Sequence, residues 1–127
     1  NIELLVNNLT VKKQLIIKGK GKVFIYIKEE GEFKTPNTVN SDQVFVFLAK
    51  DATFTIMANA TFNGYIHGPE ATVVMHNPNT ELNGSVVAQQ IKSKNNDDFV
   101  GTINYQNPPK NIGETGFSSY TKTLWSD

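Results

Sequence analysis

Two histidines and a glutamate lie close together in the sequence and could bind a metal ion. His67 and His76 stand on either side of Glu70, and imidazole nitrogens with a carboxylate oxygen are a ligand set that zinc accepts. However, Gly68 and Pro69 follow His67 directly and Asn-Pro follows His76, so both histidines adjoin turn signals. The pattern favours two surface histidines, and we expect no bound metal.

A second set of possible ligands lies further on, where Asn95 and Asn96 precede Asp97 and Asp98. Calcium takes six to eight oxygen ligands. The segment lacks the D-x-[DN]-x-[DN]-G spacing and the distal glutamate of a calcium loop. We therefore interpret residues 92–98 as a solvated loop.

Hydrolytic chemistry has little support in the chain. No G-x-S-x-G elbow is present, since Ser85 follows Gly84 inside an expected strand. Glycoside hydrolysis needs two facing carboxylates, and nothing in the sequence pairs Glu70 with Glu81. We expect no enzymatic activity and no cofactor.

Composition narrows the possible partners. The 127 residues contain twelve basic and twelve acidic side chains, all twelve bases are lysine, and cysteine is absent. A chain without arginine and without net charge is unlike a nucleic-acid-binding protein. Lack of cysteine excludes disulfides and thiolate sites. No apolar run is long enough to span a membrane, so we expect no membrane contact. The length predicts a single domain, 1–127, and we expect it to be a fragment of a longer exported protein.

Aromatic side chains are the better candidates for a binding role, because tyrosine and tryptophan rings can stack on sugars or anchor protein partners. The candidates are Tyr26, Tyr65, Tyr105, Tyr120 and Trp125. If the strand around Gly64 is regular, Phe62 and Ile66 face one side and Tyr65 the other. We therefore expect an exposed Tyr65 and take it as the candidate ligand-binding residue.

The elements that would position these residues are short strands. In residues 23–27 and 44–48, aliphatic side chains alternate with aromatic ones, and residues 54–56 and 73–75 continue the apolar pattern at period 2. Clusters of Gly, Pro and Asn separate these runs. A phrase also recurs three times, with glycines at positions 64, 84 and 101 flanked two residues away by apolar side chains. Recurrence at about 20 residues is typical of a solenoid, and it favours an all-β, short right-handed parallel β-helix; the alternative is a β-sandwich.

The repeat predicts which residues stack inside the helix. Phe62, Leu82 and Phe99 should form one interior column, and Ile66, Val86 and Ile103 another. Asn59, Asn63 and Asn83 are expected at left-handed corners, which asparagine tolerates. Phe117, Tyr120, Leu124 and Trp125 recur at helical spacing, so a C-terminal helical segment is expected to cover the open end of the stack.

The central stretch resembles a known bacterial surface domain. Residues 64–73 read G-Y-I-H-G-P-E-A-T-V and residues 82–88 read L-N-G-S-V-V-A, similar to a G-x-I-x-x-P-x-A-x-V strand followed by an L-x-G-x-(V/I)-V-A strand. Ile103-Asn104-Tyr105 and the final Trp125-Ser126-Asp127 also resemble later segments of that domain. It is the C-terminal β-helical domain of PilX-type proteins, which are associated with type IV pili. Choice-of-anchor A adhesins and tapirins look similar in style.

The resemblance implies a location and a role. It implies an extracellular domain on the cell surface of a Gram-positive bacterium, with a non-catalytic structural or adhesion role beside a type IV pilus system. The partners would then be pilus or cell-surface proteins. The alternative is a carbohydrate-binding module for cellulose or a wall glycan, whose partner would be insoluble polysaccharide.

Overall fold

In a computed structural model, which describes residues 1–34, 41–95 and 100–108, these residues form seven strands and no helix. Accordingly, no helix in this part of the chain could cross a membrane. The strands are β1 (Ile2–Val11), β2 (Val23–Phe33), β3 (Val44–Leu48), β4 (Thr53–Ile56), β5 (Thr61–Met75), β6 (Glu81–Lys92) and β7 (Thr102–Tyr105).

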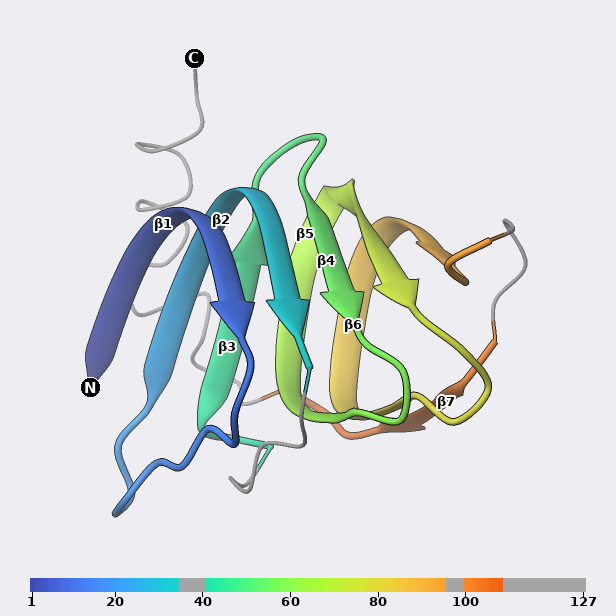
Figure 1. Cartoon of the computed structure of the whole chain (residues 1–127). Helices are drawn as coiled ribbons and strands as arrows, with labels where there is room; N and C mark the ends of the chain where they lie inside the picture. The colour runs from blue at the N-terminus through green and yellow to red at the C-terminus, as the bar shows by residue number, and fades with distance from the viewer. Residues whose placement is uncertain (35–40, 96–99, 109–127) are drawn as a thin grey trace.

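All strand pairs are parallel, and together they form a β-solenoid. The order is β1-β2-β3-β5-β6-β7, while β4 pairs with β2 and β5. The chain rises along a rear wall, crosses the top and descends at the front while it advances from left to right, which makes the coil right-handed (Figure 1). The predicted parallel β-helix is confirmed. A sandwich is excluded, because sandwich sheets are antiparallel.

A long strand such as β2 bends at a corner and so forms part of both walls. In the next coil these two parts are separate strands, β3 and β4. β2 pairs with β3 through residues 23–27 and with β4 through residues 30–33. Between β3 and β4 the chain turns at Asp51, whose φ is 66°. Asn59 makes a similar corner with φ of 62°, as predicted. Asn63 and Asn83 are instead within strands, so the corner prediction is wrong for these two.

The coil length matches the predicted period. Residues paired along the rear wall, such as Ile2 with Val23 and Phe45 with Tyr65, are 20 or 21 positions apart in the sequence. Gly64 pairs with Gly84, Phe62 with Leu82 and Ile66 with Val86, so the first two glycine phrases stack as expected.

The third phrase does not stack as expected. Ile103 pairs with Leu82 instead of continuing the column of Ile66 and Val86. The glycine spacing of 17 residues between Gly84 and Gly101 is shorter than a coil, and strand pairing restores a full coil by placing Gly101 beside Thr80. Phe99 lies outside the described residues.

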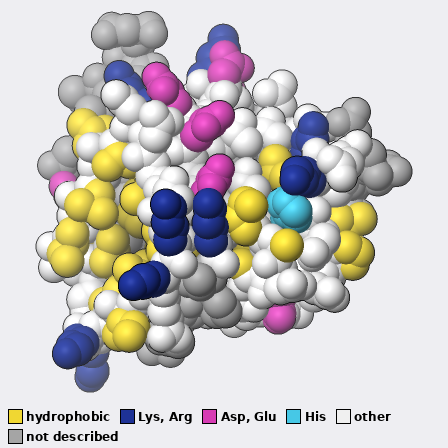
Figure 2. Space-filling view, viewed as in Figure 1, with side chains coloured by type: hydrophobic (Ala, Val, Ile, Leu, Met, Phe, Trp, Pro, Cys, Tyr) yellow, Lys and Arg dark blue, Asp and Glu magenta, His cyan; other side chains and the backbone are white. Residues whose placement is uncertain are grey.

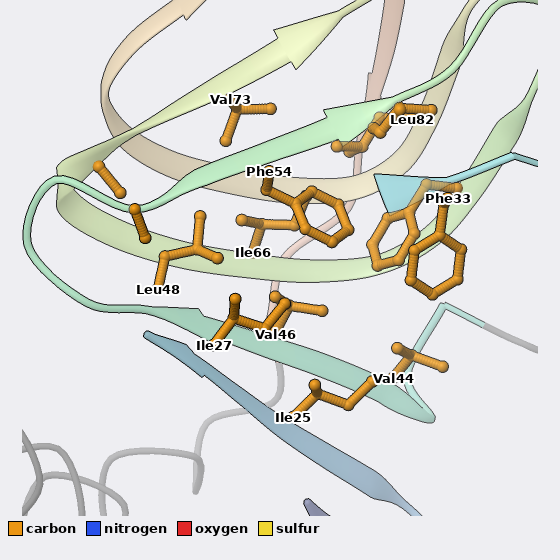
Figure 3. Packing of buried hydrophobic residues seen from close by; sticks show 14 of the residues in the cluster. Ile25, Ile27, Phe33, Val44, Val46, Leu48, Phe54, Ile66, Val73 and Leu82 are labelled. Atoms are coloured by element: carbon orange, nitrogen blue, oxygen red, sulfur yellow. The ribbon is translucent and has the colours of Figure 1, made fainter. Parts of the chain in front are cut away.

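The interior is filled by the inward-facing side chains of both walls (Figure 3). Three phenylalanines, Phe33, Phe54 and Phe62, meet there with ring centroids 4.9–5.6 Å apart. Leu82, Val73 and Ile66 continue the same apolar columns and are fully or almost fully buried. Burial of this apolar surface is the main source of the fold's stability. The predicted C-terminal cover, residues 117–125, lies outside the described residues.

Candidate functional site

Tyr65 is buried, contrary to the sequence-based expectation. Its side chain does lie on the opposite side of β5 from Phe62 and Ile66, as predicted, yet only 7% of it is exposed. Its ring stacks on Phe45 at 5.3 Å, and its hydroxyl donates to the carbonyl oxygen of Asn107 at 3.1 Å. The prediction failed because alternation gives the side of the strand and not what covers that side.

The exposed tyrosine of the described chain is Tyr105, with 66% of its surface accessible. Tyr105 belongs to the last strand, β7, where it pairs with Gly84. Its hydroxyl donates to the side-chain oxygen of Asn107 at 2.8 Å. Tyr26, another candidate ring, is 2% exposed, so it offers no surface to a ligand.

An asparagine ladder runs across the outer surface of the rear wall. Asn83 Nδ2 donates to Asn63 Oδ1 at 2.8 Å, and Asn104 Nδ2 donates to Asn83 Oδ1 at 2.7 Å. The Asn104 amide also lies 2.7 Å from Glu81 Oε1. Because each asparagine occupies the same position in consecutive coils, the amides stack at the strand spacing.

The ladder was missed from the sequence, although a signal was present. Asn63, Asn83 and Asn104 are spaced by 20 and 21 residues, which is one coil each. All three asparagine side chains point outward, because the residue before each of them, Phe62, Leu82 or Ile103, packs in the interior. Amide and carboxylate groups of this kind can exchange hydrogen bonds with hydroxyls of a sugar or with a peptide backbone.

The two histidines do not come together. His67 lies on the rear wall beside Phe47, with ring centroids 6.0 Å apart, whereas His76 follows the front-wall end of β5. Partial burial of the imidazole lowers the pKa of His67 below its usual 6.5. The described residues contain no group of three or more His, Asp or Glu side chains that could hold a metal ion. Asp97 and Asp98 lie outside those residues.

The two glutamates considered for glycosidase chemistry are also far apart along the coil. Glu81 pairs with Thr61 at the beginning of β5, and Glu70 is nine residues further along that strand. At about 3.3 Å per residue this separation exceeds the distance that a carboxylate pair requires. The arrangement therefore provides no general acid and base from this pair.

An open hollow of about 590 Å³ lies at the corner between the walls of the first coils. Side chains of both charges line it together with two neutral polar ones: Lys28, Lys50, Glu29, Glu30 and Asp51, with Asn8 and Thr53. Asn8 Nδ2 donates to Glu29 Oε2 at 3.5 Å across part of this surface. Lysines and acidic side chains are likewise mixed on the visible face in Figure 2. The surface around the hollow is therefore neither uniformly positive nor uniformly negative.

Comparison with known protein families gives a match over most of the chain. A family model described as "Domain of unknown function (DUF7305)" matches residues 1–112, which includes all the described strands. No curated protein and no solved structure matches significantly.

Proposed function

The chain belongs to the DUF7305 family, and we propose that it serves as a non-catalytic structural or adhesion domain on the outside of a bacterial cell, in association with a type IV pilus system. The main support is the regular stack of paired coils. Seven strands are joined into one parallel sheet around an apolar interior. Such a body is stiff along its axis, because each coil is hydrogen-bonded to the next.

The likeness to the PilX-type domain supports the location. Both similar segments, residues 64–73 and 82–88, lie within the run from Thr61 to Ile91, which forms β5, the following turn and most of β6. It therefore falls on two adjacent coils that pack as one unit, with 11 paired positions between the strands. A likeness on such a unit is more informative than one scattered over separate loops.

Fractionation of cells that encode this chain tests the proposal. An antibody against the domain should label the surface of intact cells, and the chain should be enriched when sheared pili are purified. A cytoplasmic protein measured in the same fractions controls for lysis. Detection of the chain only in the cytoplasmic fraction would contradict the proposal.

A carbohydrate-binding role is the second candidate, and the exposed ring of Tyr105 favours it. Tyr105 follows Asn104, the last amide of the ladder, in β7, so the two side chains point to opposite sides of the strand. The polar group at the ring is Asn107, whose side-chain oxygen accepts from the Tyr105 hydroxyl. An exposed ring beside polar groups is a usual arrangement for stacking on a sugar. Tyr65, being buried, cannot stack on a sugar in this conformation.

A pull-down on insoluble cellulose and on cell-wall glycan tests this candidate. Tyr105→Ala should weaken retention about fivefold, corresponding to about 1 kcal/mol for one ring. Val87→Ala, which changes an exposed apolar residue elsewhere on the wall, should retain wild-type binding. Absence of wild-type binding to either material would remove the carbohydrate-binding role.

A further inference from the structure

A second apolar cluster lies outside the coil. It consists of Phe24, Tyr26, Phe45, Phe47 and Tyr65, which we call the aromatic wall. These residues alternate along β2, β3 and β5 with the interior residues, such as Ile25, Val46 and Ile66. They therefore point away from the interior, on the outer side of the rear wall.

The rings stack from one coil to the next. Phe45 stacks on Phe24 at 5.1 Å and on Tyr65 at 5.3 Å, while Tyr26 and Phe47 stack at 5.6 Å. Stacking covers only the ring faces that meet. The outward edges of all five rings would remain accessible to water if nothing else lay over them.

The aromatic wall is nevertheless buried, with no ring more than 9% exposed. Outward side chains on the neighbouring coils are exposed. Leu5 pairs with Tyr26 from the coil before it and is 55% exposed. Val87 pairs with His67 from the coil after it and is 47% exposed. Among the described residues, Lys22 lies over one of these rings, with its Nζ 5.5 Å from the centre of the Phe45 ring.

The chain itself supplies a suitable cover. The Tyr65 hydroxyl donates to the carbonyl oxygen of Asn107, so the chain reaches the border of the aromatic wall just before the described residues end. Nineteen residues follow, 109–127, and lie outside the described part. Their sequence places Phe117, Tyr120 and Leu124 at helical spacing, with Trp125 beside them.

We propose that the aromatic wall is the docking site of residues 109–127, with the Phe117–Trp125 side chains against the rings. Nineteen residues span at least about 28 Å at the helical rise per residue, the most compact regular case, and the three strands of the wall span about 10 Å, so the length is sufficient. This places the segment on the side of the solenoid and not on the open end of the stack, where we expected it from the sequence.

Trp125 is the single tryptophan of the chain, so its environment can be measured directly in the full-length protein. Nuclear Overhauser effects are expected between the Trp125 indole and the rings of Phe45 or Tyr65. The protein should sediment as a monomer. Contacts from Trp125 to Ile2 or Leu4 at the first coil, no contact at all, or contacts made between two copies in a dimer would each overturn the proposal.

A pair of variants separates docking from general destabilisation. Phe45→Ala removes the central ring of the aromatic wall, and Phe54→Ala removes an equally buried ring from the interior. Under conditions where both variants remain folded, acrylamide quenching of Trp125 should increase several-fold in Phe45→Ala and stay near the wild-type value in Phe54→Ala. Equal quenching in the two variants would contradict the proposal.

Discussion

Gly84 lies directly against Gly64 on the neighbouring coil, so close that a β-carbon on Gly84 would overlap the Gly64 carbonyl oxygen. The φ of Gly84 is also +148°, a conformation that other residues rarely adopt. The recurring glycine therefore has a physical cause. It lets two coils approach where a side chain would separate them.

Replacement of this glycine should be strongly destabilising. We expect Gly84→Ala to lower the free energy of unfolding by about 3 kcal/mol, through overlap and backbone strain. Urea denaturation measures the change. Gly21→Ala is the control, because a β-carbon there meets open space, and it should change stability little. Equal effects of the two substitutions would contradict the importance of the close contact.

Leu82 provides a test of the interior. Its side chain is completely buried beside Phe62 and Ile103. Leu82→Ala should cost about 2–5 kcal/mol by leaving a cavity, and thermal unfolding would show a lower Tm. Val87→Ala, on the exposed side of the same strand, should have a small effect. A stable Leu82→Ala protein would mean that the column does not pack as described.

The asparagine ladder should contribute to stability through its central member. Asn83→Ala removes hydrogen bonds to both Asn63 and Asn104, and we expect a loss of about 1–2 kcal/mol. Asn79→Ala, in an exposed turn, is the matched control for loss of an amide. If both variants unfold at the same urea concentration as the wild type, the ladder has no net stabilising effect.

His67 should make stability depend on pH. Burial lowers its pKa in the folded state, so the unfolded chain takes up a proton near pH 6.5 while the folded chain takes it up only at lower pH. The contribution to stability is therefore complete above pH 6.5 and is lost as the pH falls toward the folded-state pKa.

Titration of the His67 ring protons by NMR would measure the folded-state pKa, which we expect below 6.5. His67→Gln should show a smaller loss of stability than the wild type between pH 7.5 and 5.5. A His67 pKa above 6.5, or the same pH dependence in both proteins, would contradict this prediction.

The sequence alone determined the fold class, the coil length and the stacking of two of the three glycine phrases. These follow from local constraints: alternation at period 2 gives each side chain its side of the strand. Recurrence at 20 residues gives the coil. The pairing of Phe62 with Leu82 could therefore be predicted without coordinates.

Only the tertiary structure decided the register of the last coil, the burial of Tyr65 and the asparagine ladder. Ile103 pairs with Leu82 because the intervening segment completes a full coil despite the shorter glycine spacing. Tyr65 is buried because the outer face of its wall is covered, a property that no local pattern contains. Asn63, Asn83 and Asn104 meet because parallel pairing places equivalent positions of successive coils side by side.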